Sequence, residues 1–336
     1  MFPNLYWRGY NLRNVALFTL FVIFISLSDL YRNLFFPWTS PSRQILGGQR
    51  GPDEKAIVTA SLRSDNTTWL YEHLPDWRKH VYVVDDPHAN LTVPVNKGRE
   101  AMAYLTYIID NYADLPPITV FLHSLRYQWH NDDPLYDSVP LLHALNLAHV
   151  HAQGYLNLRC TWTLGCPIEM HPNLSPSKMS PTATTERAYR AAFTELLPNT
   201  RVPDAIGVPC CSQFAVTRDR IRRVPREDWL RWRRWLVETP LEDQISGRVW
   251  EYSWHSTFFV VVVERSERSS VRSSADFIDG IVIFGKPAIH CPNVKSCYCK
   301  TFGLCNLNCT INECEGRYKL PSTSVVPEGW PETEWL

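Results

Sequence analysis

The sequence of 336 residues predicts an α/β fold, a mixed sheet flanked by helices, followed by a Cys-rich C-terminal tail held by disulfides. Short apolar runs alternate with segments of helical periodicity in its first half, an order typical of parallel strands joined by crossover helices. Six of the ten cysteines lie between Cys291 and Cys314 among few apolar residues, so that stretch needs cross-links. The hydrophobic fraction of 45% is that of a globular chain, and the net charge of +0 gives no support for a nucleic-acid partner.

An apolar segment near the N-terminus, Val15–Leu27, follows Arg8 and Arg13 and contains no charged residue. A basic flank before such a segment predicts a signal-anchor, which makes the chain a single-pass type II protein of the ER or Golgi membrane. Residues 1–36 are then the cytoplasmic tail and anchor, and residues 37–54, rich in Pro, Ser and Gly, are the stem. The apolar run is short for a membrane span. A cleaved signal peptide of a secreted protein and a buried helix are therefore the alternatives.

The globular domain is expected over residues 55–290, with the Cys-rich tail over 291–320 and a terminal extension over 321–336. The expected strands are 55–60, 80–84, 118–122 and 214–216. The expected helices are one after Asp65 and those over 98–112, 140–151, 185–197 and 226–238. In sheets of this kind, ligands bind at the carboxyl ends of the parallel strands, so the residues that follow each strand are candidates for a site.

Polar residues gather after the third expected strand, where His123, His130, Asp132 and Asp133 occur close together. Adjacent Asp and His residues at a strand end predict a divalent-cation site, with Mn²⁺ or Mg²⁺ held by Asp132, Asp133 and His130. His123 is then a candidate acid or base. The alternative is that the two aspartates cap the next helix and the histidines form local hydrogen bonds.

Two further polar groups are candidates for binding a nucleotide cofactor. Asp85 and Asp86 follow the second expected strand. Asn96 and Arg99 lie near the start of the next helix, where backbone N–H groups and a guanidinium can bind phosphate. Ordinary helix capping beside a solvent-facing pair of Arg99 and Glu100 is the alternative.

The third polar group is the pair Glu251 and His255, which are four residues apart. A helix would place both side chains on one face, where they can act as a catalytic base and its partner. A surface pair without a catalytic role is the alternative.

Two observations place the domain in an oxidising lumen. Four N-glycosylation sequons lie beyond the apolar segment, at Asn66, Asn90, Asn173 and Asn308. The cysteine spacings in the tail favour disulfides over the paired ligands of a zinc site, and the sequence does not choose among the possible pairings. The 13 tryptophans indicate core packing, with sugar-stacking platforms as the alternative.

A family resemblance covers most of the chain, from about Lys55 to Cys314. It is carried by the runs VVDDP (83–87), NKGREAMAYLTYIIDNYADLP (96–116), FLHSLRYQWHNDD (121–133), GVPCCSQFAVTR (207–218), EYSWH (251–255) and CYCKTFGLC (297–305). Together these runs resemble a fungal family known only as domain of unknown function 3431, whose name implies no activity. One departure is the segment 256–282, a valine run beside a Ser/Arg-rich stretch, which we interpret as a retained intron or a lineage-specific loop.

The layout of the chain is also similar to GT-A type glycosyltransferases, which have a Rossmann-like sheet behind a type II anchor and stem. This similarity implies transfer of sugar from a nucleotide-sugar to a glycan acceptor. The metal at Asp132 and Asp133 would then clamp the diphosphate, and Glu251 would serve as acceptor base. Asn131-Asp132-Asp133 departs from a clean Asp-x-Asp motif. A non-catalytic carbohydrate-binding protein and a metal-dependent hydrolase using His123, His130 and Asp133 are the alternatives.

Overall fold

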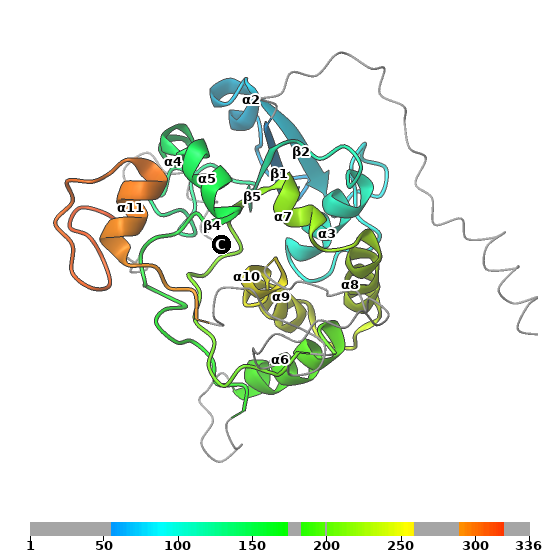
Figure 1. The fold of residues 1–336 in the computed structure, drawn as a ribbon. Helices are drawn as coiled ribbons and strands as arrows, with labels where there is room; N and C mark the ends of the chain where they lie inside the picture. The colour runs from blue at the N-terminus through cyan, green and yellow to red at the C-terminus, as the bar shows by residue number, and fades with distance from the viewer. Residues whose placement is uncertain (1–54, 174–182, 199, 259–288, 319–336) are drawn as a thin grey trace, which may run out of the picture. The chain divides into compact units, whose positions relative to one another are not determined.

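The chain is seen in a computed structural model that describes residues 55–173, 183–198, 200–258 and 289–318 (Figure 1). All of these belong to one compact unit, residues 51–336. The predicted signal-anchor, the stem, the terminal extension and the segment from 259 onward of the atypical insert lie outside the described residues. No helix within the described part of the chain is long and apolar enough to cross a membrane.

The centre of the fold is a mixed five-stranded sheet. Its strands are β1 (Lys55–Ser61), β2 (Trp77–Val83), β3 (Ile118–His123), β4 (Tyr155–Asn157) and β5 (Phe214–Thr217). The order across the sheet is β2-β1-β3-β5-β4. β1 is parallel to both β2 and β3, whereas β5 is antiparallel to β3 and β4. The predicted α/β class and the three parallel strands are therefore confirmed. β4 was not predicted, because its three residues are too few to show a period.

Helices cover both faces of this sheet, as the alternation of side chains along each strand requires. In β1, Val58 packs into one hydrophobic cluster and Ile57 into another on the opposite face, and Phe121 and Val120 of β3 divide in the same way. The predicted helix after Asp65 is α2 (Trp69–His73), which lies in the β1–β2 crossover. The β2–β3 crossover contains α3 (Ala101–Asp110), within the predicted range of 98–112.

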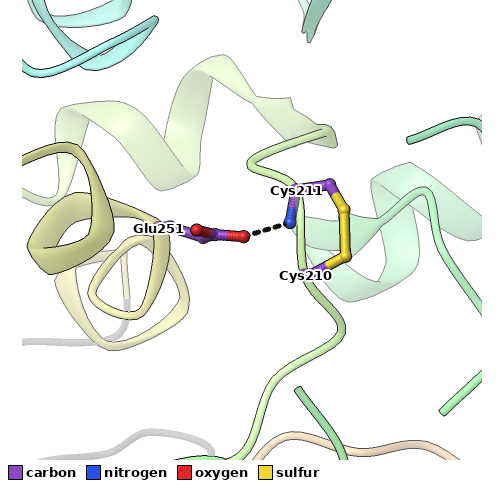
Figure 2. Close-up of side chains that lie close together, drawn as sticks. All are labelled: Cys210, Cys211 and Glu251. Atoms are coloured by element: carbon purple, nitrogen blue, oxygen red, sulfur yellow. Dashed lines mark hydrogen bonds between the residues drawn. A yellow bond between two sulfur atoms is a disulfide. The ribbon is translucent and has the colours of Figure 1, made fainter. Parts of the chain in front are cut away.

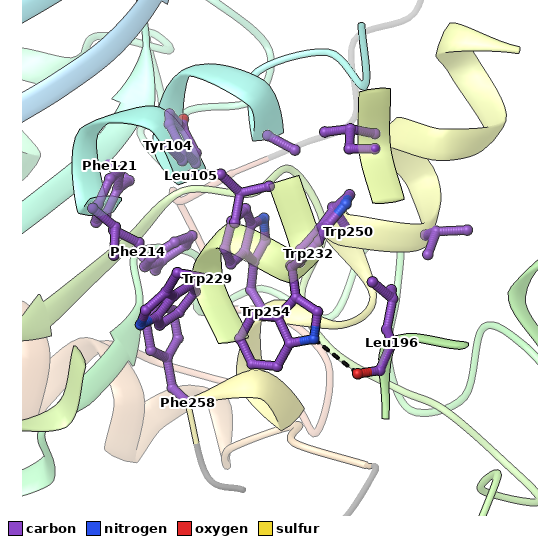
Figure 3. Packing of buried hydrophobic residues seen from close by; sticks show 14 of the residues in the cluster. Tyr104, Leu105, Phe121, Leu196, Phe214, Trp229, Trp232, Trp250, Trp254 and Phe258 are labelled. Atoms are coloured by element: carbon purple, nitrogen blue, oxygen red, sulfur yellow. Dashed lines mark hydrogen bonds between the residues drawn. The ribbon is translucent and has the colours of Figure 1, made fainter. Parts of the chain in front are cut away.

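The first face carries a core rich in tryptophan. Its helices are α3, α6 (Ala183–Leu196), α8 (Arg226–Glu238), α9 (Asp243–Glu251) and α10 (Trp254–Thr257). Figure 3 shows Trp229, Trp232, Trp250 and Trp254 packed with Phe258, and the indole N–H of Trp232 donates to the Leu196 carbonyl at 2.8 Å. These tryptophans are buried, which confirms core packing as their role.

The second face is covered by α2, α4 (Ser138–Ala144), α5 (Leu147–Gln153) and α11 (Val294–Phe302). The single helix predicted over 140–151 is wrong. The helix breaks at Leu145 and Asn146, because the Asn146 side chain caps α5 by accepting from His149 N. The Asn146 N–H also donates to the Thr301 carbonyl, so the break docks the C-terminal region.

The Cys-rich tail is disulfide-bonded, as predicted, but it also contributes to the core. α11 buries Val294, Tyr298 and Phe302 against α4 and α5. Two disulfides tie the tail to the body and two close small loops within it: Cys160–Cys297, Cys166–Cys291, Cys299–Cys305 and Cys309–Cys314. By loop-closure entropy, the separation of 137 residues for Cys160–Cys297 contributes about 5 kcal/mol, and the separation of 5 residues for Cys309–Cys314 contributes about 2 kcal/mol.

Candidate functional site

The candidate site lies at the edge of the sheet where the three parallel strands end. His123 is the last residue of β3. Because β5 runs antiparallel to β3, the residues just before β5 reach the same edge, and the Gln213 side chain accepts from His123 N at 3.2 Å. This edge is where ligands bind in parallel sheets.

The turn before β5 is closed by a disulfide between sequence neighbours, Cys210 and Cys211. Cys211 and Ser212 both have positive φ angles, +88° and +50°, so the backbone turns sharply there. The Cys211 N–H donates to the Glu251 carboxylate at 2.6 Å, as Figure 2 shows. The Cys211 carbonyl contacts the Nε2 atom of His123 at 3.0 Å. Since a carbonyl can only accept, the proton of His123 is on Nε2.

A second glutamate, Glu100, reaches this turn from the loop before α3. Gly98 adopts a φ of +74°, and the Arg99 stem packs on Gly247 of α9 so closely that a Cβ at Gly247 would lie 2.5 Å from Arg99 Cγ. The Gly247 position therefore requires glycine. This close approach holds the start of α3 against the helix that ends at Glu251.

The two glutamates have altered proton affinities. Burial raises the pKa of Glu100, and Ser212 and the Arg99 charge offset this only in part. Burial also raises the pKa of Glu251, which the Cys211 N–H lowers in part and the like charge of Glu100 raises further. A carboxyl group with a raised pKa that keeps partial exposure is a stronger base than an ordinary carboxylate and can exchange a proton with a ligand.

Histidines and one tryptophan extend the site along the loop after β3. The His123 ring stacks on His130 with centroids 4.2 Å apart, and His130 stacks on Trp129 at 4.0 Å. Burial lowers the pKa of both histidines, so both rings are neutral at neutral pH. The buried Arg159 donates to the Trp129 and His130 carbonyls and fixes this loop.

Two arginines provide positive charge at the same site. Arg99 Nε lies 3.0 Å from Asp243, and Arg248 Nε lies 3.8 Å from Glu251. Their side chains are 57% and 52% exposed, so both guanidiniums can still reach an anionic ligand.

Two of the predicted metal ligands, Asp132 and His130, form hydrogen bonds within the protein. Asp132 is buried and accepts from the backbone N–H groups of Cys160 and Thr161 and from the Tyr298 hydroxyl at 2.5 Å. It thereby joins the loop after β3 to α11. The Asp132 oxygens already accept hydrogen bonds from protein donors, and this arrangement does not fit a cation site. His130 contacts Gln128 through Nδ1 at 3.1 Å instead.

Asp133 forms local hydrogen bonds, but it does not cap the next helix as the alternative above expected. Its carboxylate accepts from Leu135 N at 2.9 Å and weakly from Asp137 N, while Asp137 caps α4 by accepting from Val139 N. In the described residues, the one group of three ligand atoms close enough to hold an ion is Cys210, Cys211 and Glu251. Its two sulfurs are bonded to each other, so it does not fit a metal in this oxidised state.

The remaining predicted residues lie in several places. Asp85 accepts from Arg63 N and Asp86 pairs with the Arg63 guanidinium at 3.1 Å, so both brace the loop after β1. Asn96 is exposed in the loop before Gly98. His255 is buried in α10, beyond the break that follows Glu251, and its ring stacks 6.3 Å from His290. A single helix does not carry Glu251 and His255.

The structure thus brings together His123, Arg99 and Glu251 from three separate motifs. Sequence reasoning missed Glu100 as a site residue and missed the Cys210–Cys211 disulfide. The sequence did offer one signal for this disulfide, which is that the two cysteines are adjacent. In the structure the other eight cysteines pair with one another. Nothing in the local sequence distinguishes Glu100 from a solvated residue next to Arg99.

No curated protein and no solved structure matches this chain significantly. Residues 57–300 match the sequence model of a family described as Protein of unknown function (DUF3431), as the resemblance above implied. That match spans most of the chain and includes every residue of the candidate site. The chain therefore belongs to the DUF3431 family.

Proposed function

We propose that this chain is a glycosyltransferase that moves a sugar from a nucleotide-sugar donor to a glycan acceptor. The observation that carries the proposal is the pair of glutamates with raised pKa at the carboxyl edge of the sheet. Glu251 acts as the base that removes the acceptor hydroxyl proton, a role that typically contributes about 10²- to 10⁴-fold in rate. Burial raises the pKa of Glu251, and the like charge of Glu100 raises it further.

The leaving diphosphate needs positive charge. In this proposal Arg99 and Arg248 supply it, because both are half exposed and lie beside the two glutamates. The oxygens of Asp132 are already bonded to Cys160, Thr161 and Tyr298, so no step is assigned to an ion held there. His123 is neutral with its proton on Nε2, and it positions the Cys211 turn that orients Glu251.

We place this activity in the lumen of the secretory pathway, with the N-terminal segment as a membrane anchor. Two observations support the placement. All ten cysteines are paired, and disulfides persist in oxidising compartments. The four sequon asparagines are exposed, as glycan attachment requires: Asn66, Asn90, Asn173 and Asn308. A loss of apparent mass after treatment with a peptide N-glycosidase tests the modification directly.

A second candidate function is carbohydrate binding without catalysis. The stack of Trp129 on His130 favours it, since a partly exposed aromatic ring next to polar groups is a common way to hold a sugar. In this case glycans bind without a donor, and Glu251 has no effect on any turnover.

One experiment separates the two. The full chain, purified in mild detergent, is incubated with UDP-, GDP- and CMP-sugars, with and without Mn²⁺ or a chelator, and its thermal unfolding is followed. The transferase proposal expects one donor class to raise the melting temperature even with the chelator present. Glu251→Gln should keep this donor binding and lose transfer to a glycan acceptor. Glu242→Gln, an exposed change beside the same helix, is the matched control.

No stabilisation by any donor contradicts the transferase. Donor stabilisation that requires Mn²⁺ contradicts the assignment of the diphosphate to the arginines.

A further inference from the structure

A cavity of 230 Å³ lies at the opposite edge of the sheet from the glutamates. It is formed where β3 begins, at Pro117, and where β5 ends and leads into α7 (Arg218–Arg222). The end of α5 and its C-cap Gly154, residues 151–154, close its other side. Arg218 N donates to the Pro117 carbonyl at 3.0 Å, which fixes α7 against the start of β3. Figure 1 shows α5 and α7 flanking β5.

The charges that line this cavity are unbalanced. Arg218, Arg220 and Arg223 contribute three positive charges, and Asp219 is the one acidic residue of the lining. The Asp219 carboxylate is 3.8 Å from Arg218 Nε and its side chain is 89% exposed, so it offsets only part of the positive charge of the three arginines. The cavity therefore attracts anions.

One of the arginines is built closely into the wall. Arg220 Nε lies over Gly154, so that a Cβ at Gly154 would be 2.9 Å from it. Gly154 also has a φ of +76°, as the C-cap of α5. Burial lowers the pKa of the Arg220 guanidinium, and the neighbouring charge of Arg223 lowers it further. A bound anion would offset this repulsion.

A fourth arginine of the same segment has a different use. Arg222 donates to the Tyr112 and Ala113 carbonyls, at 3.2 and 2.8 Å, and so holds the end of α3. Three of the segment's arginines border one cavity, and the fourth supports the fold.

We propose that this cavity is a binding site for a phosphate group, held by Arg218, Arg220 and Arg223. Guanidinium groups bind phosphate through paired charge-assisted hydrogen bonds, and three of them match its oxygens. The phosphate is that of a soluble phosphomonoester or of a lipid headgroup. The site is separate from the glutamate cluster and does not depend on the function proposed for that cluster.

Isothermal titration of the full chain in detergent, at low ionic strength, tests the site. One titrant is inorganic phosphate, and the other is phosphatidylcholine vesicles that contain a phosphatidylinositol monophosphate. Phosphate is expected to bind saturably with one site per chain. The double variant Arg218→Gln/Arg223→Gln should weaken it by at least about tenfold, and Asp219→Asn should tighten it. Tighter binding of the vesicles than of phosphate assigns the lipid source, and binding of phosphate alone assigns the soluble source.

Arg190→Gln, an exposed change on α6, is the control for net charge. The gain expected from Asp219→Asn cannot result from misfolding, so the test holds even if the double variant is destabilised. The proposal is overturned if neither titrant binds saturably. It is also overturned if Arg190→Gln weakens binding as much as the double variant.

Discussion

Two acidic pairs, Asp132 with Asp133 and Glu100 with Glu251, differ in how the protein uses their oxygens. Asp132 accepts three hydrogen bonds from distant parts of the chain, and Asp133 accepts from the turn that leads into α4. Glu251 accepts one backbone hydrogen bond and remains partly exposed. The first pair is adjacent in sequence and structural in role. The second pair is separated by 151 residues, and burial raises the pKa of both its members. Burial also raises the pKa of Asp133, but there the Leu135 and Asp137 N–H groups offset the shift in part.

This difference shows how buried acids can be distinguished. Donors that satisfy a carboxylate stabilise its charged form, so such a group supports the fold and has little capacity for chemistry. Carboxyl groups placed side by side with few donors resist ionisation, and the fold tolerates that cost where a proton must be exchanged. The predictions below test each side of this contrast, from the largest expected effect to the smallest.

The largest effect is expected at Asp132. Asp132→Asn replaces one acceptor oxygen by an NH₂ group that faces the donors Cys160 N, Thr161 N or the Tyr298 hydroxyl. Buried hydrogen bonds to a charged group are worth about 1.5 to 3 kcal/mol each, so the free energy of unfolding should fall by about 3 kcal/mol. Urea denaturation measures it. A loss below about 1 kcal/mol would show that Asp132 is not the link to α11.

The next effect is expected at the Cys210–Cys211 disulfide. The double change Cys210→Ser/Cys211→Ser frees the turn that presents one N–H group to Glu251 and one carbonyl group to His123. A misplaced base costs rate steeply, so we expect transfer activity to fall by about 10²-fold, with a smaller loss of stability. The same change at Cys309 and Cys314, far along the tail, is the control. Equal activity losses in both variants would contradict a positioning role for the turn.

A smaller effect is expected in the pH dependence of stability. The pKa of Glu100 is raised above its usual value of 4.5, so the folded state keeps this proton after the unfolded state has lost it. The free energy of unfolding therefore decreases as pH rises from about 4.5 through the folded pKa. Glu100→Gln should lack the Glu100 part of this decrease and be more stable than the wild type above that window. Glu251, Asp110 and Asp133, whose pKa values burial also raises, contribute a decrease in both proteins. His123 and His130, with lowered pKa values, act in the opposite direction below about pH 6.5 in both proteins.

Denaturation midpoints at a series of pH values give this difference directly. Parallel curves for Glu100→Gln and the wild type would mean that Glu100 titrates at its ordinary pKa.

The smallest effect is expected at Asp133. Asp133→Asn keeps an acceptor oxygen for the Leu135 N–H group, and the Arg317 guanidinium is 4.0 Å away. The free energy of unfolding should change by less than about 1 kcal/mol. Added Mn²⁺ should leave the melting temperature of this variant and of the wild type unchanged. A Mn²⁺-dependent rise that is lost in Asp133→Asn would restore the predicted metal site.

The sequence predicted the parts of the fold that follow local rules. β1, β3 and the helices α3 and α8 lie where the pattern indicated, and β2 begins three residues before its predicted start. α9 to α11 were not predicted. α11 lies in the Cys-rich tail, and α9 and α10 are separated at Tyr252 and Ser253. The pairing of Cys160 with Cys297 joins distant parts of the chain, so the spacing of the cysteines could not predict it.

The candidate site could be predicted only in part for the same reason. His123 could be placed because it ends a strand, and Arg99 because it precedes a helix. Asp132 and Asp133 have the residue types of a cation site, but hydrogen bonding to α11 and to the following turn decides their role. Glu100 meets Glu251 through the contact of Arg99 with Gly247, which depends on the packing of α9.

The most direct test of the account compares Glu251→Gln with Asp132→Asn in one denaturation series at neutral pH. Gln keeps an acceptor for Cys211 N and removes the repulsion from Glu100, so Glu251→Gln should be more stable than the wild type, on the order of 1 kcal/mol. Asp132→Asn should be less stable by about 3 kcal/mol. If both variants lose stability to a similar degree, both acidic pairs are structural and the assignment of the site to Glu100 and Glu251 is wrong.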